Sequence, residues 1–340
     1  MIGLIARADN TGLGIQTHEF YKHIQPDKTL VVDVSKLNQL PQHGYRYPDA
    51  KTVTDKMSIA DINEFLDGLN VIFCCETPYN YDLFRIARNK GIKIILQYNY
   101  EFLDMKRAAD IYYPDVFAAP SAWHIEDVKK EFRNVLHLPV PVNRGLLPFK
   151  EKKIYSKFLH IAGNSAVHDR NGTAAVIAAF SQVNIAGIEL AVKCFNKNAV
   201  NELPKTEAKN IYLDVHNTTN YEHNYMGFDA LILPRKYGGL CLPMQEALSC
   251  GMPVIMTDTS PNNNILPKEW LVPVKSKFNF QSRYTIQVNE PDISELANKI
   301  KWLAEMDEPT AIENSRIADK ISSELDWKIW KEKYLDFLNS

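Results

Sequence analysis

The sequence has no long apolar run. No stretch of its 340 residues approaches the roughly 18–20 consecutive apolar residues that a membrane-spanning helix needs. The apolar start at residues 1–6 is too short for the hydrophobic region of a secretory signal, and it runs directly into Arg7 and Asp9. We therefore expect neither a membrane span nor a signal peptide.

Cysteine pairs and metal-binding patterns are also scarce. The five cysteines are odd in number, show no C-x-x-C spacing and lie mostly in apolar contexts. Buried, reduced thiols fit this pattern, so we expect the protein to be cytoplasmic. The sequence contains no H-E-x-x-H, no D-x-D pair and no Cys/His cluster, so no metal site is predicted.

The sequence has little net charge. Its 39 basic and 41 acidic residues leave a formal charge of -2. No overall basic field therefore attracts nucleic acid or an anionic membrane, although a local basic patch is compatible with this composition.

Apolar runs and helical patterns alternate along the first half of the chain. Runs of strand length lie at residues 2–6, 29–34, 71–75, 92–97, 116–119 and 135–138. Helical patterns lie between most of them, at residues 15–24, 59–66, 81–89 and 122–132. This alternation predicts an α/β domain with a parallel sheet covered by helices.

The pattern breaks once and then restarts. Residues 139–148 hold three prolines and interrupt the periodicity, as a linker does. Strands are then predicted at residues 158–162, 188–193, 211–215, 228–234 and 253–257, with a helix at residues 172–182. We predict Rossmann-like domains over residues 1–148 and 149–325, and a C-terminal helix over residues 326–340 whose aromatic residues recur three or four residues apart.

The most informative segment is YGGLCLPMQEALSCGMPVIMTD, at residues 237–258. It lies between two predicted strands, so it forms a strand–loop–helix–strand unit. Gly238 and Gly239 let a ligand reach the backbone of the loop, and the unpaired amides at a helix start attract anions. Pro243 suits the first helical turn. Glu246 lies about one turn inside the helix, where a carboxylate can accept hydrogen bonds from the vicinal hydroxyls of a ribose.

This segment resembles the GT-B glycosyltransferases of the large retaining group that includes glycogen synthases and bacterial mannosyl- and glucosyltransferases. Residues 239–254 are similar to the pattern G-F-G-L-P-x-x-E-A-x-x-x-G-x-P-V of that group. The resemblance implies two Rossmann-like domains that face each other across a cleft. The first domain would bind the acceptor and the second the nucleotide-sugar donor.

The resemblance also assigns a role to the motif residues. A glutamate at the position of Glu246 binds the donor ribose in that group, and the donor loop corresponds here to Tyr237, Gly238, Gly239, Leu240, Cys241 and Leu242. Another glutamate usually stands eight positions before Glu246 and contacts the donor sugar. This chain has Gly238 there, which departs from the pattern.

A second match lies near the start of the second domain. Gly163 and Asn164, followed by the run DRNGT at residues 169–173, resemble the strand–glycine and R-K-G elements whose cations hold the donor diphosphate. Arg170 can bridge phosphate oxygens in a bidentate way. Asn171 stands where lysine is usual, and Lys193 at the end of the next strand is a candidate replacement.

In the first domain, candidate site residues follow the ends of two predicted strands. Gly12 and Gly14 resemble the glycine turn of the group, and the residues just before them are candidate acceptor contacts: Asp9, Asn10 and Thr11. Asn99 and Glu101 follow another strand and are catalytic candidates near the anomeric carbon, together with Arg170.

The resemblance implies a retaining, metal-independent hexosyltransferase. Its substrates would be a UDP- or GDP-sugar and an acceptor hydroxyl, it would need no cofactor, and the chemical class of the acceptor is not implied. Three alternatives are a glycosyltransferase acting on hydroxymethylated DNA bases, a sugar-nucleotide epimerase and a non-catalytic GT-B binding protein. The small net charge gives the DNA alternative little support, and Gly238 is the best argument for the binding protein. A dinucleotide oxidoreductase is disfavoured because Thr17 occupies the third glycine position of G-x-G-x-x-G.

Overall fold

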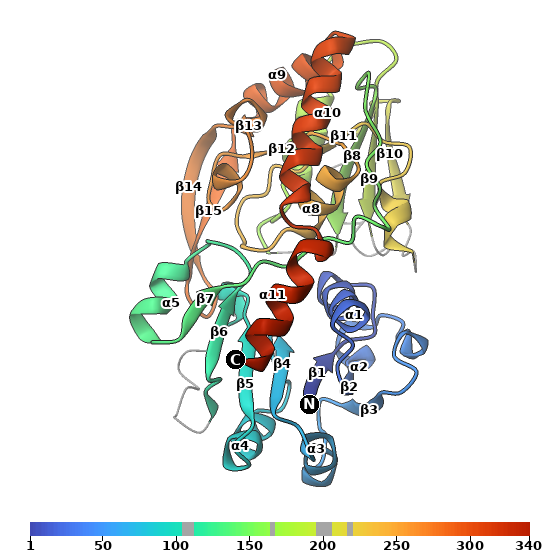
Figure 1. Ribbon diagram of the computed structural model, residues 1–340. Coiled ribbons are helices and arrows are strands. Elements are labelled where there is room, and N and C mark those ends of the chain that lie inside the picture. Colours follow the sequence, from blue (N-terminus) through green and yellow to red (C-terminus); the bar gives the residue numbers. More distant parts are fainter. Residues whose placement is uncertain (104–111, 164–166, 195–205, 216–219) are drawn as a thin grey trace. The chain divides into compact units, whose positions relative to one another are not determined.

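The computed structural model describes residues 1–103, 112–163, 167–194, 206–215 and 220–340 (Figure 1). The chain divides into two compact units, of which unit 1 comprises Met1–Pro141 and Trp327–Ser340, and unit 2 comprises Val142–Asp326. The units part between Pro141 and Val142, whereas the sequence places the boundary between residues 148 and 149. The C-terminal segment of unit 1 starts at Trp327, next to the predicted start at residue 326. The acceptor and donor roles of the two domains stay predictions.

Unit 1 is built on a seven-stranded parallel sheet with the order β3-β2-β1-β4-β5-β6-β7. Its strands are β1 (Ile2–Ala6), β2 (Lys28–Asp33), β3 (Lys51–Thr54), β4 (Val71–Cys75), β5 (Lys93–Gln97), β6 (Val116–Ala119) and β7 (Val135–His137). Its helices are α1 (Gly12–Ile24), α2 (Ser35–Asn38), α3 (Ile59–Leu66), α4 (Asp82–Asn89), α5 (Ile125–Glu131) and α11 (Trp327–Asn339), with short 3-10 turns at Gly44–Arg46 and Tyr100–Phe102. Strand β4 is buried along its whole length, as expected for a strand covered on both faces.

Helix α11 packs within unit 1 through its aromatic side chains. The Trp327 ring stacks on His23 of α1, with 4.7 Å between ring centroids. The Tyr334 hydroxyl donates a hydrogen bond of 2.8 Å to the carbonyl of Pro139 and accepts one of 3.1 Å from Gln97 at the end of β5. The aromatic stripe of the C-terminal sequence is therefore a packing surface of unit 1.

Unit 2 contains a six-stranded parallel sheet with the order β10-β9-β8-β11-β12-β13. Its strands are β8 (Lys157–Gly163), β9 (Glu189–Cys194), β10 (Ile211–Val215), β11 (Ala230–Ile232), β12 (Val254–Thr257) and β13 (Leu271–Val272). Its helices are α6 (Thr173–Phe180), α8 (Leu242–Ser249), α9 (Ile293–Ala304) and α10 (Glu308–Ser323), with 3-10 turns at Tyr221–Asn224, Asn262–Asn264 and Lys268–Trp270. A separate antiparallel hairpin joins β14 (Val274–Gln281) to β15 (Thr285–Pro291).

The two parallel sheets confirm the predicted α/β class. No helix within the described ranges is both long and apolar enough to cross a bilayer. The sequence did not predict β3, β13 or the β14–β15 hairpin. Strand β3 reads Lys-Thr-Val-Thr at the edge of its sheet, and β14 is mostly exposed, so neither has the continuous apolar pattern by which the central strands were found.

Candidate functional site

Each sheet has one point where the winding of the chain reverses. In unit 1 this point lies between β1 and β4, and in unit 2 it lies between β8 and β11. Open parallel sheets bind ligands outside the carboxyl ends of their strands at such points. The loops that follow β1, β8 and β11 carry most of the predicted site residues, so the topology gathers them at the expected edge of each sheet.

The loop after β11 is built around Arg235 and Gly238. The Arg235 side chain is buried, its Nε donates a hydrogen bond of 3.1 Å to the Tyr237 carbonyl, and its Nη1 donates one to the Leu240 carbonyl. Gly238 has a φ of 114°, and a Cβ atom there would overlap Nη2 of Arg235 and lie 2.9 Å from its Cζ. Glycine is therefore required at residue 238 by both the backbone conformation and the position of the guanidinium.

The same loop is tied to the loop that follows β8. The Lys236 amide donates a hydrogen bond of 2.8 Å to the Arg170 carbonyl, and the Tyr237 hydroxyl donates one of 2.6 Å to the Val167 carbonyl. The Lys236 ammonium forms an ion pair of 2.9 Å with Glu290 on β15. The fold thus brings the two predicted donor-side loops together.

The backbone amides at the start of helix α8 can bind an anion. Its first residue is Leu242, Cys241 occupies the N-cap position, and no described side chain caps the helix. Pro243 lies in the first turn, as predicted. Gly239 and Leu240, just before the helix, are half-buried. Backbone amides and the positive end of the helix dipole at such a terminus favour a phosphate or carboxylate.

Glu246 lies in α8 and is held by a tyrosine from another segment. Its side chain is buried, and its Oε2 accepts a hydrogen bond from the hydroxyl of Tyr225. Burial, with the charge of Glu246 as the next cause, holds the pKa of Tyr225 well above its ordinary value. The phenol therefore stays protonated and fixes the orientation of the carboxylate.

The loop after β8 uses its polar residues largely for its own structure. Gly163 has a φ of 72°, and Asn164 lies outside the described residues. The Asn171 amide donates two hydrogen bonds of 3.1 Å to carbonyls of β8. The Asp169 carboxylate accepts hydrogen bonds of 2.8 and 3.0 Å from the first amides of α6, so this helix start already has an anion. Arg170, which lies between Asp169 and Asn171 in the sequence, is half-buried.

Lys193 lies at the end of β9, where the sequence places it. Its ammonium is 3.4 Å from Oδ2 of Asp214 on β10, and only 12% of its side chain is exposed. It also lies over the Phe228 ring, 5.3 Å from the centroid. Because Asp214 compensates its charge, Lys193 has less to offer a second anion than its sequence position indicates. Its donor-binding role stays a prediction.

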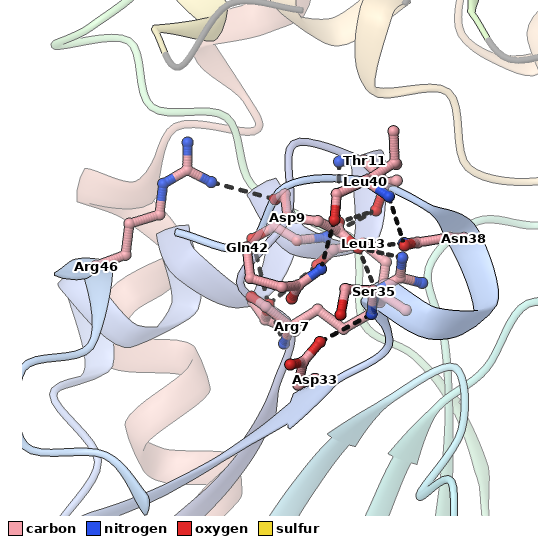
Figure 2. A network of polar contacts seen from close by, with 12 residues as sticks. Arg7, Asp9, Thr11, Leu13, Asp33, Ser35, Asn38, Leu40, Gln42 and Arg46 are labelled. Carbon is pink, nitrogen blue, oxygen red and sulfur yellow. Dashed lines mark hydrogen bonds and ion pairs between the residues drawn. The ribbon is translucent and has the colours of Figure 1, made fainter. Parts of the chain in front are cut away.

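In unit 1, Asp9 is the centre of a polar network after β1, shown in Figure 2. The residue is fully buried. Its Oδ1 accepts from the amide and hydroxyl of Thr11, and its Oδ2 accepts from Arg7 Nε at 3.0 Å and Asn38 Nδ2 at 2.8 Å. These contacts give the Asp9 carboxylate a structural role in shaping the loop, while its predicted contact with an acceptor stays untested.

The start of α1 depends on the same loop. Thr11 is the N-cap residue, and its hydroxyl accepts a hydrogen bond of 3.3 Å from the Gly14 amide. A Cβ at Gly14 would overlap the Asp9 carbonyl, so glycine permits the close approach of helix and loop. Gly12 is exposed at the first position of the helix, and Asn10 accepts a hydrogen bond of 2.6 Å from Arg46.

The two catalytic candidates of unit 1 follow β5. Glu101 is buried in the turn Tyr100–Phe102, and Asn99 precedes that turn. The Asn99 amide donates a long hydrogen bond of 3.4 Å to Glu76, which follows the neighbouring strand β4. The parallel strands therefore bring Glu76 beside the predicted pair.

Sequence reasoning missed several residues that shape these loops: Arg7, Asn38, Glu76, Tyr225, Arg235 and Lys236. Arg235 and Lys236 directly precede the glycine loop, so the two adjacent cations were a local signal. Tyr225 and Asn38 come from separate segments, and nothing nearby in the sequence links them to their partners. Within the described ranges, no group of three or more His, Cys, Asp or Glu side chains could hold a metal ion.

Comparison with known proteins gives no match in sequence and a clear match in structure. No protein-family model and no curated protein matches the chain. The structure is similar to HepE from Anabaena, solved in complex with UDP and glucose, with a TM-score of 0.73, 11% identity and 99% of each chain covered.

Two further solved structures agree over almost the whole length. Sucrose-phosphate synthase from Thermosynechococcus elongatus is 13% identical with a TM-score of 0.70, and a glycosyltransferase from Rickettsia africae is 12% identical with a TM-score of 0.70. In both, 99% of this chain and 97% of the other are covered. The chain therefore has the GT-B fold.

Proposed function

We propose that the protein is a glycosyltransferase that moves a sugar from a nucleotide-sugar donor to an acceptor hydroxyl. The sugar that we propose is a hexose. One observation carries the proposal. In unit 2, helix α8 follows Gly238 and Gly239, and no side chain in the described part of the chain caps its start. About one turn later lies the buried carboxylate of Glu246, which Tyr225 orients. Amides suit the phosphates of a nucleoside diphosphate, and the Glu246 carboxylate suits its ribose hydroxyls.

The relatives in structure support a UDP-sugar as the donor, and a GDP-sugar is the alternative that the sequence resemblance gives. HepE was solved with UDP and glucose, and separately with UDP-glucose. The donor is a substrate in this proposal, and no cofactor is required.

Donor cleavage breaks the bond between the anomeric carbon and the diphosphate, so negative charge accumulates on the leaving phosphate. Arg170 and the backbone amides of residues 238–242 would stabilise that charge without a metal ion. We further propose that the transfer retains the anomeric configuration through a front-face reaction, in which a leaving phosphate oxygen takes the proton of the acceptor hydroxyl. A pair of carboxylates of the glycosidase type is then unnecessary.

Unit 1 would bind the acceptor. The exits of β1, β4 and β5 lie at one edge of its sheet, and they carry Asn10, Glu76, Asn99 and Glu101. Asn99 and Glu101 are the residues that we assign to the neighbourhood of the anomeric carbon.

Isothermal titration with UDP-, GDP- and ADP-glucose tests the donor site. Wild-type protein should bind at least one of them, and Glu246→Gln should weaken that binding about 10- to 100-fold, because a neutral amide accepts hydroxyl hydrogen bonds less strongly than a carboxylate. Glu308→Gln is the matched control, since Glu308 is more than half exposed and pairs with Lys153 at the surface. Wild-type protein that binds none of the three, or equal effects of both substitutions, would contradict the proposal.

A further inference from the structure

Arg235 is a buried cation that no described carboxylate compensates. Only 7% of the residue is exposed, and the two hydrogen bonds that it makes within the described chain go to backbone carbonyls. The adjacent Lys236 is equally buried, but its ammonium lies 2.9 Å from Glu290 and 3.7 Å from Asp169. A guanidinium without a counter-charge is costly to bury, which sets Arg235 apart from its neighbour.

One nitrogen of the guanidinium is available to a ligand. The two hydrogen bonds to the loop use Nε and Nη1, and no described residue accepts from Nη2. That nitrogen lies beside Gly238, in the space that a side chain at residue 238 would fill. The absence of a side chain at Gly238 therefore leaves room for the N–H groups of Nη2.

The start of α8 is a second positive feature of the same loop. Nη1 of the same group binds the carbonyl of Leu240, two residues before the first residue of α8. The start of α8, which no described side chain caps, carries the positive end of the helix dipole. Two positive groups on one short loop repel each other, and an anion bound at this loop offsets both charges.

We propose that Arg235 is a ligand-binding residue that donates from Nη2 to an anionic oxygen group of the nucleotide-sugar donor. That group is either a phosphate of the diphosphate or an acidic substituent, such as a carboxylate, on the donor sugar. Gly238 is the residue that gives this group access to the guanidinium. The assignment rests on the proposed function, because it takes the ligand of this loop to be a nucleotide sugar.

The test compares a series of ligands that adds the diphosphate, a neutral sugar and an acidic sugar in turn. Dissociation constants are measured by calorimetry for uridine, UDP, UDP-glucose and UDP-glucuronate, or for guanosine, GDP, GDP-mannose and GDP-mannuronate if the wild type selects guanine. Arg235→Gln is compared with wild type and with Arg316→Gln. The latter removes the same charge from a side chain that is 70% exposed and pairs with Glu151.

We expect Arg235→Gln to weaken binding of the charged group about 10- to 100-fold and to leave nucleoside binding within about twofold. Equal losses for the diphosphate and its neutral-sugar ester identify a phosphate as the partner. A loss confined to the uronate identifies the carboxylate of the sugar. Arg316→Gln should change none of these values by more than about twofold.

A second variant covers the case in which Arg235→Gln does not fold. Arg235→Lys keeps the positive charge but lacks the second guanidinium nitrogen, so it cannot donate both to the loop carbonyls and to the ligand and should produce the same selective loss. Circular dichroism and the thermal midpoint establish that each variant is folded.

Three results would overturn the assignment. Unchanged affinities in folded Arg235→Gln show that the guanidinium binds no donor group. Equal losses for the nucleoside and the diphosphate show that Arg235 only shapes the loop. Wild-type protein that binds none of the ligands overturns the proposed function, and this assignment with it, whereas the first two results leave the proposed function standing.

Discussion

The hydroxyl of Tyr225 donates a hydrogen bond to Oε2 of Glu246, which lies 21 residues further along the chain. Both side chains are buried, and the raised pKa of Tyr225 keeps the phenol protonated. Tyr225 belongs to the 3-10 turn Tyr221–Asn224 as its C-cap, whereas Glu246 belongs to α8. This hydrogen bond fixes the position of Oε2 and thereby orients the whole carboxylate. Tyr225 is therefore a positioning residue for the proposed ribose contact.

Tyr225→Phe should weaken donor binding about three- to tenfold, because the carboxylate loses the donor that fixes its orientation. Its matched control is Tyr155→Phe, which removes a buried hydroxyl that donates 2.8 Å to the Ala311 carbonyl elsewhere in unit 2. Both variants should lose about 1–2 kcal/mol of unfolding free energy, but the control should bind donor normally. Calorimetry measures the donor affinity of both variants. Equal affinities would show that Tyr225 does not position the Glu246 carboxylate.

Arg170→Gln should lower kcat about 100-fold and affect donor binding less, because the negative charge on the leaving phosphate is greatest in the transition state. Steady-state kinetics and donor titration on the same variant separate the two effects. An unchanged kcat would exclude Arg170 from leaving-group stabilisation.

Asp9→Asn should lower the free energy of unfolding by about 3 kcal/mol, because it removes the charge that faces the largely buried Arg7. Asp67→Asn, at an exposed position of the same unit, should have little effect. Urea denaturation compares the two variants. A stability loss for Asp9→Asn no larger than that of the control would contradict the structural role given to the network in Figure 2.

The buried imidazole of His160 should make stability depend on pH. Its Nδ1 contacts the Ile232 carbonyl at 2.7 Å and its Nε2 contacts the Thr173 hydroxyl at 2.9 Å, and burial lowers its pKa to about 4. An unfolded histidine titrates near 6.5, so between these values the unfolded chain binds more protons than the folded one. Stability is fully retained above pH 6.5 and is lost as the pH falls towards 4, by up to about 3 kcal/mol from this residue.

Urea denaturation between pH 4 and 7 measures this effect in wild type and in His160→Asn, whose amide can still donate to the Ile232 carbonyl. The difference in unfolding free energy between the two proteins should narrow as the pH falls. A difference that is constant over this range would show that His160 does not titrate as described.

The parts of the fold that were predicted from sequence are those with a continuous apolar pattern. Val71–Cys75 and Val116–Ala119 were predicted with their observed bounds. The hairpin of β14 and β15 was missed because its residues alternate in burial along β15 and are largely exposed along β14, so that its polar composition is typical of a loop. Pairing between the two strands, which no local pattern reports, holds it together.

The candidate site divides in the same way. The loop, the helix start and Glu246 were predicted because turn residues and a helix lie within ten residues of sequence. The hydrogen bond between Tyr225 and Glu246 was not predicted, because only the tertiary fold brings these two residues together. Asp9 was predicted from its position at a strand end as an acceptor contact, and that contact stays a prediction. Its structural role, given by burial and four contacts from Arg7, Thr11 and Asn38, emerges only in the folded structure.

The most direct test of the central claim is the fate of the donor that the protein binds. Proton NMR follows wild-type protein with that nucleotide sugar, first with water as the acceptor and then with candidate acceptor hydroxyls. A retaining glycosyltransferase should release the nucleoside diphosphate and transfer the sugar with the anomeric configuration of the donor, and Glu246→Gln should abolish most of this release. An intact donor under all conditions, a sugar epimerised while still attached to the nucleotide, or a product of inverted configuration would contradict the account.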